Sequence, residues 1–364
     1  MGKHVPDYFK ISPFLTFFLI TAVQVGVGIL SFQSIIVEPA GYDAWISIII
    51  ASIGVHILIF MMYKILNQEE HKDIFDIQTM LFGKWIGKSL GVITCVYFLL
   101  MSFVALRLYI EIIQVWMFPQ ISLLVVGTVF LLLVLYIING GFKVIAGICF
   151  LGVVIPLYLI LTLIFPLEFA YYDNLKPVLN HSVIELLLSA QKMTLSYLGF
   201  STLFVYYPFL KEPKKTQKFA HFGVAFTTFL YVSTAIVSFL FYDEEQIKTV
   251  IWPTLGIWKI IEMPFVERFE YIGISSWTLV ILPNITLTLW ASSRGMKRMF
   301  NVNQRKTLIV YAIIIITVML TVRGFDNIDK ISELVTRFGF YYVFVYIPVL
   351  CIIHFIFQKV RESK

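Results

Sequence analysis

Long apolar runs separated by short polar linkers make up almost the whole chain. Most are long enough to cross the roughly 30 Å hydrocarbon core of a bilayer. A segment exposed to lipid must satisfy its own backbone hydrogen bonds, so continuous runs predict helices, whereas a barrel shows short alternating strands. The pattern predicts an all-α polytopic membrane protein with ten transmembrane helices in one integral membrane domain, 1–364. The expected spans are 13–37, 44–66, 89–117, 121–138, 144–165, 184–210, 219–241, 264–293, 306–322 and 338–358.

Lysine and arginine give the expected orientation of these spans. With the N-terminus inside, internal segments hold about three times as many basic residues as external ones, as the positive-inside rule requires. "KEPKKTQK" (211–218) and "RGMKRMFNVNQRK" (294–306) carry most of this excess. Both termini are therefore expected in the cytoplasm. Only 14% of residues are charged, against about 25% in soluble domains, so the net charge of +6 reflects topology in a lipid bilayer and indicates no nucleic-acid partner.

Ten spans divide into two sets of five, 13–165 and 184–358. Because five is odd, the second set would be inverted relative to the first. Inverted repeats are a transporter architecture in which corresponding helices are interrupted near the membrane midplane. We therefore predict an inverted five-plus-five repeat with broken helices 1 and 6.

Glycines lie where these interruptions are expected. "TAVQVGVGIL" (21–30) holds Gly26 and Gly28 near the middle of the first span, and Gly199 in "SYLGFS" lies at a matching depth in the sixth. Glycine in a helix interior costs roughly 1 kcal/mol relative to alanine, so these positions favour unwound backbone. The alternative is close helix packing, although the usual packing spacing is Gly-x-x-x-Gly.

The surroundings of these glycines indicate the class of ligand. No Asp, Glu, Lys or Arg lies within five residues of any of the three, so backbone dipoles would hold a zwitterion, with helix N-termini facing a carboxylate and free carbonyls facing an ammonium. Tyr97 and Met101 share one face of the third span. The other candidates for an apolar pocket are Leu198, Phe200, Thr286 and Trp290. Ordinary packing is the alternative for each of these side chains.

Charged residues near the external ends are candidates for a gate or for coupling. Arg107 and Glu111 are spaced to pair on one face of the third span, while Glu267, Arg268 and Glu270 open the eighth. A structural ion pair and an interfacial helix start are the alternatives. Three scattered cysteines suggest neither disulfides nor a metal site. The chain shows no motif for an enzyme and calls for no cofactor.

Several stretches resemble the endospore germination permease family, the B subunits of nutrient germinant receptors. The stretches that carry this resemblance are "QVGVGILSFQ" (24–33), "AGYDAWIS" (40–47), "LFGKWIGKSLG" (81–91), "YYDNLKPVL" (171–179), "YYPFLKEPKK" (206–215) and "ERFEYI" (267–272). That family belongs to the amino acid, polyamine and organocation superfamily. The resemblance implies a site for a small amino acid between spans one, three, six and eight, at Gly26, Gly28, Tyr97, Met101, Leu198, Gly199 and near Thr286. It also implies A-type and C-type partner subunits and a spore inner membrane or cell membrane location.

Two functions that use the site remain open from the sequence, beside a scaffold with a vestigial pocket, which would bind no ligand. A germinant-sensing subunit would bind an amino acid and signal to its partners to start germination. An ion-coupled amino acid transporter of the same fold would need an ion site. "GICFLGVVIPLYLILTLI" (147–164) in the fifth span holds no Asp, Glu, Lys, Arg or His, and Ser292 and Ser293 are the possible cation ligands in the eighth. Because the sequence holds little evidence of an ion site, it favours the sensor over the ion-coupled transporter.

Overall fold

The computed structural model describes residues 5–362 except 70, 265 and 323. Within that part of the chain the fold is helical, and the extended pairing amounts to two isolated bridges. The first half consists of η1 (Asp7–Phe9), α1 (Leu15–Gln24), η2 (Val27–Leu30), α2 (Phe32–Ala40), η3 (Gly41–Asp43), α3 (Ala44–Gln68), α4 (Ile74–Trp116), α5 (Leu123–Asn139), α6 (Phe142–Val154), η4 (Ile155–Phe169) and η5 (Tyr172–Leu175).

The second half begins with another interrupted segment, in which short helices follow one another from 183 to 209. Its elements are α7 (Val183–Lys192), α8 (Thr194–Tyr197), η6 (Phe200–Thr202), α9 (Leu203–Tyr206), η7 (Tyr207–Phe209), α10 (Pro213–Phe241), α11 (Glu244–Thr249), α12 (Pro253–Lys259), α13 (Phe269–Phe300), α14 (Gln304–Thr321), α15 (Phe325–Phe340), η8 (Tyr341–Tyr346) and α16 (Ile347–Glu362).

The predicted all-α class and the two broken helices are confirmed. Seven helical stretches among the described residues are long and apolar enough to cross a membrane, and α1 and α5 are shorter apolar helices. Together with these nine, the discontinuous segment from α7 to η7 would make ten candidate spans. Ten spans and their division into two repeats stay predictions.

One helix begins well before its predicted span. α4 starts at Ile74, where the Asp73 side chain accepts a hydrogen bond from the Asp76 backbone N–H at 3.1 Å, and it bends at Gly83, whose φ is +77°. Ile74, Phe75 and Ile77 are buried although they precede the apolar run. The first turns of α4 are thus an amphipathic segment at the membrane surface, which a search for continuous apolar runs does not include.

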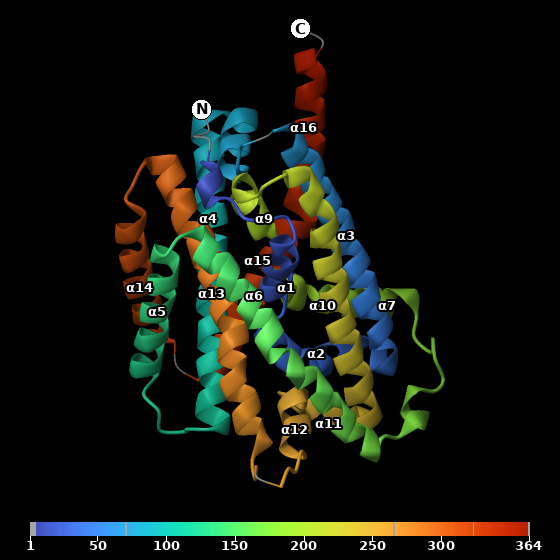
Figure 1. Cartoon of the computed structure of the whole chain (residues 1–364). Helices are drawn as coiled ribbons and strands as arrows, with labels where there is room; N and C mark the ends of the chain where they lie inside the picture. The colour runs from blue at the N-terminus through green and yellow to red at the C-terminus, as the bar shows by residue number, and fades with distance from the viewer. Residues whose placement is uncertain (1–4, 70, 265, 323, 363–364) are drawn as a thin grey trace.

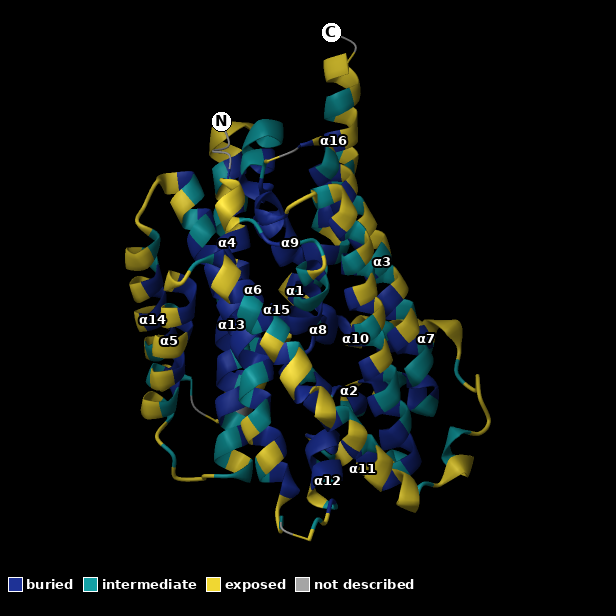
Figure 2. Ribbon diagram, viewed as in Figure 1, coloured by how far each residue is buried: buried dark blue, intermediate teal, exposed yellow. Residues whose placement is uncertain are grey.

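The buried centre of the bundle is α13, which packs along α4 (Figures 1 and 2). Side-chain hydroxyls join the two helices, since Ser102 and Thr288 lie 2.8 Å apart and Tyr109 and Thr278 lie 2.6 Å apart. Helices α5 and α14 form an edge of the bundle with many exposed apolar side chains (Figure 2). Both termini lie at the same end of the molecule, and α2, α11 and α12 lie toward the opposite end (Figure 1).

The "AGYD" stretch anchors the long loop that precedes α7. The Asp43 carboxylate accepts backbone N–H bonds from Leu179 at 2.8 Å, Asn180 at 2.7 Å and His181 at 3.1 Å. The His181 ring lies against Gly41, where a Cβ would come within 2.6 Å of it and where φ is +49°. Glycine and aspartate at these two positions therefore fix the loop onto the junction of α2 and α3.

Candidate functional site

The two interrupted helices meet at the centre of the bundle. α1 ends at Gln24, and the backbone is extended at Val25 and Gly26 before η2. In the second interruption Gly199 has φ +101°, and a Cβ there would lie 2.9 Å from both the Cβ and the carbonyl oxygen of Val23. A side chain at Gly199 would meet both a backbone penalty and a clash, so glycine is required for the two breaks to touch.

Gly26 and Gly28 have a different role from Gly199. A Cβ at Gly26 would approach the Asn284 side-chain nitrogen to 3.1 Å, and one at Gly28 would approach the Ser196 hydroxyl to 3.0 Å. Both glycines therefore allow polar groups from α13 and from the other break to come close to the first break. The unwound-backbone and close-packing interpretations both describe part of this arrangement.

Side-chain donors already satisfy the backbone carbonyls around the breaks. The Asn284 amide donates to Val23 O at 2.9 Å, and the Trp277 indole donates to Gly26 O at 3.2 Å. A single hydroxyl, that of Tyr231, lies 3.0 Å from Gln24 O and 3.2 Å from Ser196 O and so bridges the two breaks. The Thr254 hydroxyl also donates to Ile29 O at 2.9 Å, and the Gln24 side-chain amide donates to Tyr197 O at 3.4 Å.

A small cavity lies against the first break, with a volume of about 50 Å³. We call it the break cavity. Its polar side chains are Gln24, Ser196 and Asn284, and no Asp, Glu, Lys, Arg or His of the described chain lines it. The buried side-chain Oε1 of Gln24 has no hydrogen-bond partner among the described residues and is free to accept one. The other lining residues are Val23, Gly26, Val27, Gly28, Met101, Val104, Ala105, Leu108, Leu195 and Val335.

The predicted ligand-binding residues fall into two groups. Gly26, Gly28 and Met101 line the break cavity. The other predicted residues do not line this cavity. Tyr97 packs on Phe338 and Tyr342, and Trp290 packs on Phe142, Phe209 and Arg294. Leu198 lies against Gly339, Gly199 lies against Val23, and Phe200 and Thr286 are buried in the core. The ligand-binding roles of this second group stay predictions.

Sequence reasoning did not single out Gln24, Ser196 or Asn284. Asn284 precedes Thr286 by two positions, which turns it about 200° around the helix axis, so only one of the two can face the cavity. The sequence did contain a signal for Asn284. A side-chain amide inside an apolar span costs free energy unless it has a hydrogen-bond partner, so its position marks a polar contact within the bundle. Gln24 gave the same signal two residues before Gly26.

A larger hollow leads from the end opposite the termini to the break cavity. Its volume is about 480 Å³, and we call it the vestibule. Val27, Gly28, Leu108 and Leu195 line both spaces and form the thin wall between them. Charged side chains of the vestibule are Glu38, Lys248 and Asp329. The break cavity is therefore closest to solvent on the side away from the termini.

The end of the bundle that holds the termini is closed by several contacts. Ile11 N–H donates to Phe209 O and Lys211 N–H donates to Ile11 O, both at 2.9 Å. The Arg298 guanidinium pairs with Asp73 at 2.9 Å and also with Asp76. The vestibule is thus open at one end of the molecule while the other end is closed.

The charged candidates form two separate local pairs. Arg107 is buried in α4 and donates a hydrogen bond to Glu111 at 2.8 Å. It directly precedes Leu108, which lines both the vestibule and the break cavity. At the start of α13, Arg268 donates to the buried Glu270 at 2.8 Å, while Glu267 is exposed. None of the five lines the break cavity. Their gate or coupling roles stay predictions.

Two interrupted helices that meet at a small cavity inside an apolar bundle define an integral membrane protein with a transporter-like fold. A family model described as spore germination protein matches residues 10–329. The chain belongs to this family, which confirms the predicted resemblance.

Two curated relatives support this assignment. Spore germination protein GerQB of Bacillus cereus is 40% identical over 99% of this chain and 100% of its own length. Spore germination protein A2 of Bacillus subtilis (strain 168) is 23% identical over 84% of each chain. Among solved structures, the crystal structure of MhsT in complex with L-phenylalanine matches with a TM-score of 0.60 at 16% identity, covering 93% of this chain and 87% of that one. This likeness shows the fold.

Proposed function

We propose that this protein is a germinant-sensing subunit of a spore nutrient receptor, which binds a small amino acid in the break cavity. The observation that carries the proposal is a small, mostly apolar cavity with three polar side chains at the meeting point of two broken helices. Helix ends and unpaired polar groups suit a zwitterion, and the apolar wall suits an apolar side chain. The relatives are named spore germination proteins, and MhsT is described in complex with L-phenylalanine.

Access to the proposed site comes from the vestibule. If the termini are cytoplasmic, as the basic residues indicate, the vestibule faces outward. An amino acid arriving from outside the membrane would pass Leu108 and Leu195 to reach the break. Binding can act on A-type and C-type partner subunits only if the ligand interacts differently with two conformations of this protein.

Ion-coupled amino acid transport is the second candidate, because the fold is shared with MhsT. The lining of the break cavity speaks against it, because no Asp or Glu among the described residues lines the cavity to balance a bound cation. The predicted cation ligands Ser292 and Ser293 donate their hydroxyl hydrogens to Cys95 O at 2.7 Å and to Trp290 O at 3.0 Å. The absence of a carboxylate from this lining favours a sensor that moves no coupled ion. We assign no enzyme activity.

Binding and uptake measured on one reconstituted preparation would test both candidates. The probes are radiolabelled L-alanine, L-valine, L-leucine and L-phenylalanine. Val104→Phe places a ring in the break cavity, and Val96→Phe on the exposed face of α4 is the matched control. Overfilling a packed site costs roughly 1–3 kcal/mol, so we expect Val104→Phe to weaken binding by about tenfold or more and the control to bind normally.

Each outcome decides between the candidates. Binding without uptake, lost in Val104→Phe alone, supports the sensor. Uptake that follows a proton or sodium gradient makes the protein a transporter. If none of the four amino acids binds the wild-type protein, or if both variants bind equally well, the break cavity is not the ligand site.

A further inference from the structure

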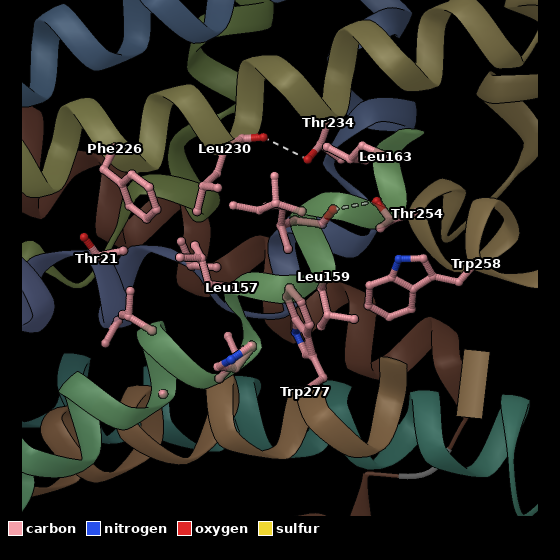
Figure 3. A pocket seen from close by; sticks show the side chains of 18 residues that line it. Thr21, Leu157, Leu159, Leu163, Phe226, Leu230, Thr234, Thr254, Trp258 and Trp277 are labelled. Carbon is pink, nitrogen blue, oxygen red and sulfur yellow. Dashed lines mark hydrogen bonds between the residues drawn. The ribbon is translucent and has the colours of Figure 1, made fainter. Parts of the chain in front are cut away.

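A second cavity lies on the other side of the first break (Figure 3). Its volume is about 80 Å³, and residues of α1, η2, α6, η4, α10, α12 and α13 line it. We call it the lateral cavity. Ala22, Val25 and Ile29 line it, whereas the neighbouring Val23, Gln24 and Gly26 line the break cavity. One short segment of backbone therefore separates the two spaces.

The polar groups of the lateral cavity all have partners within the protein. Three threonines and two tryptophans line it, and none of their polar atoms is left without a hydrogen bond. The bonds run from Thr21 to Gly223 O at 3.4 Å, Thr234 to Leu230 O at 2.8 Å, Thr254 to Ile29 O at 2.9 Å, Trp258 to Thr162 at 3.2 Å and Trp277 to Gly26 O at 3.2 Å. A mostly apolar space whose polar side chains offer no free donor holds water poorly and suits an apolar occupant.

The lateral cavity opens toward the lipid-facing surface of the bundle. Leu157 at its edge is 42% exposed, and Ile160 and Phe226 are partly exposed. The neighbouring outer face of η4 carries Leu161 and Ile164, each 65% exposed and apolar. Since the break lies near the middle of the first apolar run, this mouth is at the depth of lipid chains and away from the headgroups.

The wall on the mouth side has unusual local structure. η4 is a 3-10 helix of 15 residues, whereas such helices rarely exceed three or four residues and often mark a hinge within a longer helix. Pro156, near its start, lines the cavity and lacks a backbone N–H. An occupant that fills the space behind this wall would supply packing contacts that an empty cavity lacks.

We propose that the lateral cavity binds an alkyl chain of a membrane phospholipid, inserted from the bilayer between η4 and α10. The chain would contact Trp277 and Thr254, which hold the Gly26 and Ile29 carbonyls of the break. Lipid occupancy then restrains the first break from the side opposite the break cavity. The proposal does not depend on amino acid binding, because it rests on a separate space.

Photolabelling in nanodiscs tests the site directly. The probe is a phosphatidylcholine that carries a diazirine near the end of one acyl chain, at low abundance in unlabelled phosphatidylcholine. Ile160→Trp fills the cavity from η4, and Ile164→Trp adds the same ring to the exposed face of that helix. We expect mass spectrometry to find adducts on Trp258 and Trp277 in the wild type, reduced roughly tenfold by Ile160→Trp and unchanged by Ile164→Trp.

Two further measurements keep the result decisive. Ile160→Phe repeats the block with a smaller ring, and size-exclusion chromatography checks that each variant is folded. Equal labelling of Trp258 and Trp277 in the wild type and in folded Ile160→Trp or Ile160→Phe would overturn the proposal. It is also overturned if a diazirine-bearing alkanol labels these residues and excess phosphatidylcholine does not compete, because the site would then take free apolar molecules.

Discussion

The three glycines at the breaks have different structural roles, whereas the sequence predicted one role for all three. Gly199 supplies a left-handed backbone conformation, while Gly26 and Gly28 supply room for Asn284 and Ser196. The interruption itself was predictable from two glycine positions at equal depth. The partners were not, because they come from α13 and from the other break, about 170 or more residues away.

Gly199→Ala should destabilise the protein strongly. The left-handed φ and the 2.9 Å approach to Val23 together predict a loss of about 2–4 kcal/mol. Gly147→Ala is the control, because a Cβ at Gly147 in α6 meets nothing within 4 Å, and we expect it to be neutral or stabilising by up to about 1 kcal/mol. Thermal unfolding in detergent measures both. Equal melting temperatures for the two variants would contradict the role of Gly199.

Asn284→Leu should also lower stability, through a different cause. It removes the donor to Val23 O and leaves a buried carbonyl unpaired, which costs about 1–3 kcal/mol. Asn139→Leu removes an equivalent bond, from Asn139 to Leu135 O at 2.9 Å, at the exposed end of α5, and should change stability by less than about 0.5 kcal/mol. The two melting temperatures are compared under one condition, and no difference between them would refute the importance of the Asn284 bond.

At the scale of elements, hydropathy located the helices but not all of their ends. α4 and α15 begin before the apolar runs that they continue into. Their first turns are amphipathic: in α4 Phe75 and Ile77 are buried while Lys84 and Trp85 beyond the bend are exposed. Such segments bury one face only, so their mean hydropathy stays low and a run-length criterion misses them.

Asp43→Asn should release the loop that precedes α7. An amide oxygen can accept fewer bonds than a carboxylate, so some of the N–H groups of Leu179, Asn180 and His181 would lose their partner. We expect hydrogen exchange at 179–181 to accelerate about tenfold, which corresponds to about 1.4 kcal/mol of lost local stability. The control is Asp173→Asn, since Asp173 is exposed and its carboxylate pairs with Lys176 of the same loop. Unchanged exchange in Asp43→Asn would exclude the anchoring role.

At the scale of the molecule, the sequence predicted the membrane class, the family and the two interruptions. It could not predict which faces of α4 and α13 meet, because that depends on helix rotation. Asn284 and Thr286 lie two positions apart, yet Asn284 lines the break cavity and Thr286 is buried in the core. The lateral cavity was equally out of reach, since its walls come from seven helical elements spread over residues 21–280.

The closed end of the bundle should open when its ion pairs are removed. Arg298→Gln leaves Asp73 and Asp76 without this cation. Cys95 is buried beneath the contact between Phe75 and Gly295, so its reaction with a membrane-permeant maleimide should accelerate about tenfold or more. Arg305→Gln, at an exposed position in the first turn of α14, should leave the rate unchanged. Peptide mass spectrometry follows Cys95, and an equal rate in both variants would show that these pairs do not close this end.

The Tyr231 hydroxyl carries one hydrogen but faces two acceptors, Gln24 O and Ser196 O. When the two breaks lie together, the acceptors share that hydrogen, and when they move apart one acceptor keeps it outright. Separation therefore forfeits less than a full hydrogen bond, whose net worth is about 1 kcal/mol. This hydrogen bond therefore contributes only a several-fold factor to the balance between joined and separated breaks. A ligand offsets that factor if it binds one of the two arrangements several-fold more tightly than the other.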